Sequence, residues 1–486
     1  MVFSSAIFLF LFLPIVLVGH WLAGPRLRNA FLLFASLVFY AWGEGTYVSV
    51  MLLSILCNYL FGRVLDSSFF RKSLRSRQRA LLGSMVLINL VPLLYFKYYE
   101  FIFDSLVAVL PGYFGPLQVE QQIHLPIGIS FFTFQAISYL IDIYRRANGA
   151  QKSLLDTGLY ISLFPQLIAG PIVRYAQVAD QLRTRVQNAE LFASGVTRFV
   201  QGLAKKILIA NPLGYISDLV FDLPTSDLTM ATAWLGAVCY TLQIYFDFSG
   251  YSDMAIGLGR MLGFKFQENF NFPYISRSIR EFWHRWHISL STWFRDYVYI
   301  PLGGNKRGDF VTARNLFTIF FLCGLWHGAS WNFVIWGLLH GLFLSLERGL
   351  WGRILRGLPR VLQHAYVLLI VVLAFVFFRA DTLSHSQAVL AAMCNASDGL
   401  RLYPTVAIEL DREFYLTLGL GLLLSTPIAS VLSSRIKEIA LALAPRTRIP
   451  IVSVSLVSLM LLGVLFSLSA LEVASGSYNP FIYFRF

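Results

Sequence analysis

The sequence predicts an all-α polytopic membrane protein, and three observations support this fold class. Hydrophobic residues make up 57% of the 486-residue chain and charged residues only 13%, against about 25% charged residues in ordinary soluble domains. The mean hydropathy is +0.64 over the full length, and no polar linker divides the chain. We therefore expect one integral membrane domain over residues 1–486, with about 10–12 transmembrane helices plus short re-entrant or amphipathic helices.

The first part of this domain, residues 1–153, contains apolar runs that alternate with basic clusters. The runs cover residues 6–18, 29–42, 47–61, 81–95 and 125–144. The basic clusters are Arg26 with Arg28, six residues between positions 63 and 79, and Arg145 and Arg146 with Lys152. Cytoplasmic loops carry the excess of Lys and Arg, so the N-terminus, the turn at 43–46 and the loop at 111–122 are predicted outside.

The second part, residues 154–350, contains short apolar segments that Gly and Pro interrupt at 165–175, 210–214 and 245–257. Interrupted helices at membrane depth are tolerated only where they are packed in protein or line a watery cavity. We therefore expect a core of broken helices here. The third part, residues 351–486, returns to long apolar runs at 366–378, 416–432 and 451–468.

The formal net charge of +13 is spread among the spans, which argues against a nucleic-acid-binding protein. In cytoplasmic loops this charge could attract a phosphorylated donor. The four cysteines are widely separated, with neither metal-ligand spacing nor a disulfide framework.

The main candidate for a functional site is the stretch GLWHGASWNFVIWGLLHG, residues 324–341. It places His327 in a strongly apolar segment. An ionisable group at that depth is costly unless it is paired or used. Small residues beside it would let a backbone or a substrate come close. We interpret His327 as a catalytic base, with Ser330 and Asn332 as neighbours that could orient it. The alternative is a structural, hydrogen-bonded histidine.

A second candidate segment, residues 281–304, is too polar to span lipid and too aromatic for a solvated loop. Helical spacing would place His284 and His287 on one face, one turn after Glu281, with Arg295 as a further polar candidate. Its tryptophans could instead make it an interfacial anchor. A metal needs three or four ligands, and we expect no metal here.

Two other polar residues have less support. His340 lies thirteen residues after His327, so on a continuous helix it would face about 220° away. We expect it to be structural unless the helix breaks. Asp247 is a candidate buried carboxylate near the site, or alternatively a helix cap. The other histidines have no supporting context.

Three ordered motifs resemble those of the membrane-bound O-acyltransferase family. They are YFDFSGYSDMAIG, EFWHRWHISLSTWFRDYVYIPLGG and GLWHGASWNFVIWGLLHG. Within that family the chain is most similar to the bacterial subgroup that O-acetylates alginate, and the resemblance covers nearly the whole chain.

The resemblance implies tilted spans around a thin central layer, with cavities from both sides meeting near a catalytic histidine. The signature histidine of the family falls on His327, and its second histidine falls on His287. The implied reaction takes an acetyl group from a cytoplasmic thioester, expected to be acetyl-CoA as a substrate with no bound cofactor. A separate periplasmic acetyltransferase or polysaccharide-modifying protein then places it on an exopolysaccharide such as alginate. The implied location is the bacterial inner membrane.

Alternatives remain open at this point. The same fold could transfer D-alanine to teichoic acid, or acetylate peptidoglycan or cellulose. A different class is a transporter or flippase in which His327 relays protons. An acyl-histidine intermediate is a further mechanistic alternative.

Overall fold

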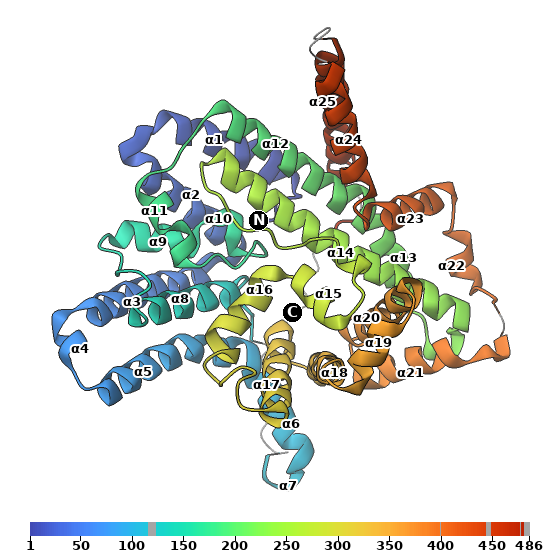
Figure 1. Ribbon diagram of the computed structural model, residues 1–486, viewed down its shortest axis with the longest axis horizontal. Coiled ribbons are helices and arrows are strands. Elements are labelled where there is room, and N and C mark those ends of the chain that lie inside the picture. The colour runs from blue at the N-terminus through green and yellow to red at the C-terminus, as the bar shows by residue number, and fades with distance from the viewer. Residues whose placement is uncertain (115–122, 399, 444–448, 477, 481–486) are drawn as a thin grey trace.

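The computed structural model describes the whole chain except residues 115–122, 399, 444–448, 477 and 481–486. The described residues form helices joined by loops, without a β-strand, which confirms the predicted fold class. Most helices surround a centre occupied by α14 (Met230–Met261), α15 (Ile279–Arg285) and α16 (Ile288–Phe294) (Figure 1).

The helices of the first part follow the predicted apolar runs. They are α1 (Leu13–Leu22), α2 (Gly24–Glu44), α3 (Val48–Asp66), α4 (Ser68–Lys72), α5 (Arg75–Leu93), α6 (Tyr99–Val109), α7 (Pro111–Phe114) and α8 (Ile129–Tyr144). Two π-helical turns, η1 (Phe8–Phe12) and η3 (Leu94–Tyr98), lie before α1 and between α5 and α6. The predicted outer loop at 111–122 falls largely outside the described residues.

The second part contains shorter helices around α14. They are α9 (Leu154–Ser162), α10 (Phe164–Leu167), α11 (Tyr175–Arg183), α12 (Ala189–Ala204), α13 (Asn211–Phe221), α17 (Asp309–His327) and α18 (Trp331–Leu346), with π-helical turns at η4 (Lys205–Ala210) and η7 (Arg295–Tyr299). The third part comprises α19 (Leu350–Gly357), α20 (Arg360–Arg379), α21 (Leu383–Cys394), α22 (Pro404–Ile408), α23 (Arg412–Leu424), α24 (Ile428–Leu443) and α25 (Ile449–Ala474).

The predicted broken helices are only partly present. The chain leaves helical geometry after α10 and resumes it at Tyr175, as expected for 165–175. The predicted breaks at 210–214 and 245–257 are wrong. The chain stays helical from α12 through η4 into α13, and α14 runs through the second segment without interruption. Its glycines serve helix packing instead: a Cβ at Gly257 would lie 2.6 Å from the carbonyl oxygen of Gly195 on α12. Small residues at a helix interface allow this close approach.

Membrane spans can be counted by helix length and apolar composition. Among the described residues, five helical runs qualify, or seven if each of two sharply bent pairs counts as one span. This criterion gives fewer spans than the predicted 10–12 because it passes over short apolar helices such as α8. The protein is a multi-pass membrane protein, and its exact span number stays a prediction.

The first and second parts of the chain share one hydrophobic core. Phe3, Phe8, Phe39 and Phe164 pack together and are fully buried. The ring of Phe3 also stacks on Tyr251 of α14, with centroids 4.4 Å apart. Because the N-terminal segment packs directly on the central helix, the two parts hold each other in place around the candidate site.

Candidate functional site

His327 is the last residue of α17, at the tip of a tight helical hairpin formed with α18. The apolar segment 315–346 is therefore broken at residues 328–330. A Cβ at Gly337 of α18 would lie 2.1 Å from the carbonyl oxygen of Phe320, so only glycine permits the observed approach of the two helices. Nearer to His327, a Cβ at Gly324 would lie 2.3 Å from the carbonyl oxygen of Phe333, so the backbone that this small residue admits is that of α18.

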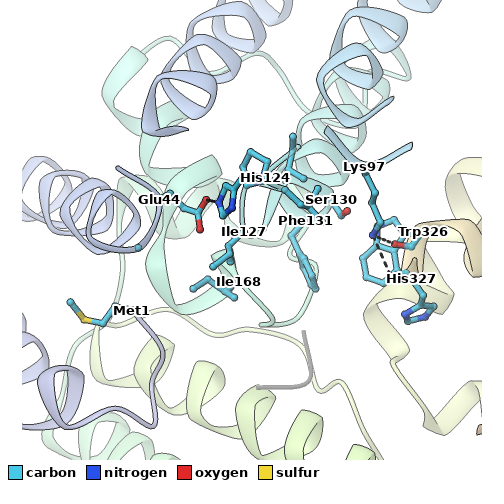
Figure 2. A pocket seen from close by; sticks show the side chains of 15 residues that line it. Met1, Glu44, Lys97, His124, Ile127, Ser130, Phe131, Ile168, Trp326 and His327 are labelled. Atoms are coloured by element: carbon cyan, nitrogen blue, oxygen red, sulfur yellow. Dashed lines mark hydrogen bonds and ion pairs between the residues drawn. The ribbon is translucent and has the colours of Figure 1, made fainter. Parts of the chain in front are cut away.

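The imidazole of His327 is enclosed by aromatic rings and is 6% exposed. Its centroid lies 4.9 Å from those of Trp326 and Trp336 and 5.1 Å from that of Phe378. His327 also lines a pocket of about 460 Å³. In Figure 2, Glu44 and His124 lie on one side of this pocket, with Lys97, Trp326 and His327 on the other. His327 is therefore buried in protein and forms part of the wall of one pocket, while its Nε2 atom has almost no exposed surface.

The wall of this pocket supports part of the predicted orientation. Met1, Gly43 with Glu44, and His124 all line it. They come from the N-terminus, from the predicted turn at 43–46 and from just after the predicted loop at 111–122. The sequence predicts all three on the same side of the membrane, and the structure brings them together. That this side is the periplasm stays a prediction.

Lys97 and Tyr98 cap the carboxyl end of α17. Lys97 Nζ donates to the carbonyl oxygens of Trp326 at 2.6 Å and His327 at 3.3 Å. Tyr98 Oη donates to the carbonyl oxygen of Leu325 at 2.7 Å. The last carbonyls of a helix have no partner within it, and a cation there is favourable. The turn η3 therefore fixes the end of the helix that carries His327.

His287 lies between α15 and α16 rather than on a helix. α15 ends at Arg285, Trp286 is extended, and His287 has a φ of 43°. The prediction that His284 and His287 share a helical face is therefore wrong, because the helix stops between them. A left-handed backbone costs about 1–3 kcal/mol for a residue other than glycine, so the surrounding structure must hold it.

The neighbours of His287 determine its position and which of its ring nitrogens carries the hydrogen. His287 is fully buried, and its Nδ1 lies 3.2 Å from Asn269 Oδ1. That oxygen also accepts from the backbone N–H of Ser289 at 3.1 Å and from its hydroxyl at 2.9 Å. A backbone N–H only donates, so the atom that it meets is the amide oxygen, and Nδ1 of neutral His287 carries the hydrogen. Its Nε2 is then an acceptor.

The Nε2 of His287 has no hydrogen-bond partner among the described residues. The ring centroids of His287 and His327 lie 6.5 Å apart. Two neutral imidazoles at this separation can both face a small polar group placed between them. An acceptor nitrogen suits the binding of a hydroxyl hydrogen, whereas stabilising an oxyanion would require a donor at that position.

The polar candidates beside His327 serve the fold. Asn332 is buried on α18, and its Nδ2 donates to the carbonyl oxygen of Ala380 at 2.6 Å, while its Oδ1 accepts from Ser386 at 3.3 Å. It therefore ties α18 to the α20–α21 junction. Ser330 precedes α18, and its side chain makes no capping hydrogen bond.

The remaining candidates lie elsewhere. Asp247 sits in the middle of α14, so the alternative of a helix cap is wrong; it forms a buried ion pair with Lys206 at 2.9 Å. Arg295 is exposed and pairs with Asp296 at 2.6 Å. His284 is exposed on α15, where its Nδ1 contacts the carbonyl oxygen of Arg280 at 2.6 Å.

The tryptophans of segment 281–304 and His340 pack in the interior of the protein. Trp283, Trp286 and Trp293 are buried, so the interfacial-anchor alternative is wrong for them. Because the hairpin breaks the helix, His340 lies nearer to His327 than a continuous helix would allow: Trp336 contacts both rings, at 5.0 Å from His340. His340 also stacks on Phe282 within the buried core.

Sequence reasoning missed three residues of the pocket. They are Lys97 and the pair of Glu44 with His124, whose Oε2 and Nε2 lie 3.0 Å apart. A lysine at the end of an apolar run was a usable signal, because ionisable groups at membrane depth are functional candidates. Among the described residues, no group of three or more His, Cys, Asp or Glu side chains is placed to hold a metal ion.

Comparison with known proteins places this geometry in context. The family model for the membrane-bound O-acyltransferase family matches residues 34–378. The chain is 43% identical to the probable alginate O-acetylase AlgI of Azotobacter vinelandii and 41% identical to that of Pseudomonas aeruginosa, with full coverage of both chains in each case. It is 35% identical to a peptidoglycan O-acetyltransferase of Helicobacter pylori, over 81% of this chain and 80% of that one.

The matched region contains both histidines, the hairpin and the capping lysine. The predicted resemblance and the predicted enzyme class are thereby confirmed. The protein is an O-acyltransferase, and the chain belongs to the membrane-bound O-acyltransferase family.

Proposed function

We propose that the protein takes an acetyl group from acetyl-CoA on the cytoplasmic side and delivers it outward for O-acetylation of an alginate-type exopolysaccharide. The observation that carries this proposal is the pocket that reaches His327 from the side on which the sequence predicts the N-terminus. The similarity to alginate O-acetylases over the full chain supports the polymer class. The basic clusters predicted in the cytoplasm suit an anionic donor.

In this proposal His327 acts as the general base. It takes the proton from an acceptor hydroxyl in the pocket while the hydroxyl oxygen attacks the thioester carbonyl carbon. The new C–O ester bond forms, the C–S bond breaks, and the departing thiolate receives the proton. His287 accepts a hydrogen bond through Nε2 and so orients the reacting group, while Asn269 holds the tautomer that this requires.

A separate periplasmic protein completes the proposed route by placing the acetyl group on the polymer. The enzyme would then lie in the bacterial inner membrane with its N-terminus in the periplasm. The pocket volume of about 460 Å³ accommodates a small acceptor group more readily than a polysaccharide chain, which fits an acceptor presented by such a partner.

The test is to express the protein in an alginate-producing host that lacks its own O-acetylation system, together with its candidate periplasmic partners. Partners are recovered by pull-down, and ester-linked acetate is measured separately on alginate and on peptidoglycan. We expect acetate on alginate that depends on both the protein and a partner. Acetate on peptidoglycan alone would replace this proposal with the second candidate, which the Helicobacter pylori relative favours.

Donor and transport are tested with inverted membrane vesicles supplied with radiolabelled acetyl-CoA. We expect label to reach the acceptor in vesicles that contain the wild type. Acetylation that continues in a folded His327→Ala variant would instead favour a transporter whose histidine is not a catalytic base.

A further inference from the structure

A second cleft lies at the opposite end of the hairpin from the pocket that reaches His327. It has a volume of about 710 Å³, and its lining residues come from the start of α15, the end of α18 and the short helix α19. Its charged lining residues are Arg277, Arg280, Glu281, Glu347, Arg348 and Arg356. We call this the arginine cleft.

The arginine cleft lies on the face opposite the pocket. Arg348, just after α18, forms an ion pair of 3.6 Å with Asp309 at the start of α17. The two open ends of the hairpin therefore meet on one face, and its tip with His327 lies a helix length away. Since the pocket residues are predicted outside, the arginine cleft is predicted to face the cytoplasm.

The carboxylates of the cleft are already engaged. Glu347 accepts from the backbone N–H groups of Ile279 at 2.6 Å and Arg280 at 3.0 Å, and so caps α15. Glu281 pairs with Arg285 at 3.0 Å and more loosely with Arg277 at 3.9 Å. Both carboxylates keep their negative charge, but the four arginines that line the cleft outnumber these two glutamates.

Two arginines of the cleft can still bind an anionic ligand. Across the described part of the chain, no carboxylate lies within ion-pair distance of the Arg280 or Arg356 guanidinium, and both residues are exposed. Guanidinium groups bind phosphate bidentately. A surplus of arginine in a concave site is therefore suited to a phosphorylated ligand.

The cleft connects to the candidate catalytic residues along α18. Leu344 lines the cleft, and Trp336, eight residues earlier on the same helix, contacts His327. That spacing corresponds to about 12 Å along a helix, which a flexible thioester arm can cover. The space between Leu344 and His327 is filled by the packed rings of Trp283, His340 and Trp336. These side chains must move apart for a thioester arm to enter.

We propose that the arginine cleft binds the phosphate groups of the acyl donor, and that Arg280 and Arg356 are their principal ligands. The inference rests on the proposed use of a CoA-type thioester. The phosphorylated end stays at the cytoplasmic face while the acyl end extends along α18 toward His327.

The test is the double variant Arg280→Gln/Arg356→Gln, with Arg353→Gln as the matched control, because Arg353 is exposed on α19 but does not line the cleft. Purified protein in nanodiscs of neutral lipid is titrated with CoA, and KM and kcat for acetyl-CoA are measured. Loss of two charge-assisted contacts should weaken CoA binding and raise KM by about tenfold or more, with kcat unchanged. The KM of the wild type should also rise with ionic strength, and that of the double variant should rise less.

Two results would overturn the inference while the proposed function survives. One is acetylation from acetyl-CoA by the double variant with unchanged KM and unchanged CoA binding. The other is a double variant that keeps CoA binding but no longer binds phosphatidylglycerol added to its neutral-lipid nanodiscs, which would identify the phosphate ligand as a lipid headgroup. If the wild type neither binds CoA nor acetylates from acetyl-CoA, the proposed donor itself is wrong, and the cleft assignment is wrong with it.

Discussion

The surroundings of His327 and His287 differ in a way that separates their roles. His327 ends a helix, is packed among three aromatic rings and forms part of a pocket wall. His287 lies between two helices, is fully buried and contacts the amide oxygen of Asn269. One imidazole therefore belongs to a residue of a pocket wall, whereas the other is fully enclosed and held in a fixed tautomer.

In the proposed mechanism the two histidines are held in place in two different ways. The position of His327 comes from the helix it ends and from the cap that Lys97 supplies. The position of His287 comes from a polar network and a strained backbone. Substitutions at these residues should consequently have graded effects, which the following experiments rank from largest to smallest.

Removal of the imidazole in the pocket wall should have the largest effect. A general base contributes about 10²–10⁴-fold to rate, so His327→Ala should reduce acetate transfer to near the detection limit. Transfer is measured in membranes from labelled acetyl-CoA, normalised to inserted protein by immunoblot. Full insertion with wild-type transfer would contradict the assignment of His327 as the base.

Removal of the buried imidazole should have a strong but smaller effect. His287→Ala should lower kcat by about 10²-fold, the scale expected when a reacting group is misplaced. Asparagine tolerates a left-handed backbone better than alanine does, so His287→Asn separates loss of the ring from backbone strain. If His287→Asn restores activity, the ring itself is dispensable and the role assigned to Nε2 is wrong.

The sequence predicted the fold class and the family because long ordered motifs carry that information. The same motifs name His287 and His327 as candidates, and the structure brings their ring centroids to 6.5 Å from each other. The sequence did not predict the break at Trp286 and His287, since helical periodicity extends smoothly through both residues. It also placed a break within α14, because glycines that pack helices closely look the same in sequence as glycines that interrupt them. Lys97 could not be placed because its partner Trp326 is 229 positions away, and only tertiary packing brings them together.

A substitution of the capping lysine tests whether acetate transfer requires the end of α17 to be held in place. Lys97→Met keeps an apolar stem of similar length but removes both hydrogen bonds to the Trp326 and His327 carbonyls. A hydrogen bond to a charged group is worth about 1.5–3 kcal/mol, so kcat should fall by about tenfold or more while insertion is retained. Tyr98→Phe is the matched control, because it removes the hydrogen bond to the carbonyl oxygen of Leu325 and leaves those of Lys97 in place. A Lys97→Met enzyme with wild-type kcat would show that the cap does not position His327.

His340 should give the smallest effect, although it is as deeply buried as the other two histidines. Its ring lies nearly parallel to Phe282, at an interplanar angle of 3° and a centroid distance of 6.2 Å. A phenylalanine can occupy the same space, and volume-conserving core substitutions usually cost less than about 1.5 kcal/mol. His340→Phe should therefore change kcat by less than about tenfold, measured in the same membrane assay, whereas His340→Ala should mainly lower thermal stability through the cavity it leaves. If His340→Phe reduced transfer as far as His327→Ala in a stably inserted protein, the distinction between reacting and packing histidines would fail. The imidazole of His340 would then have to take part in the reaction through Trp336 or through the donor itself.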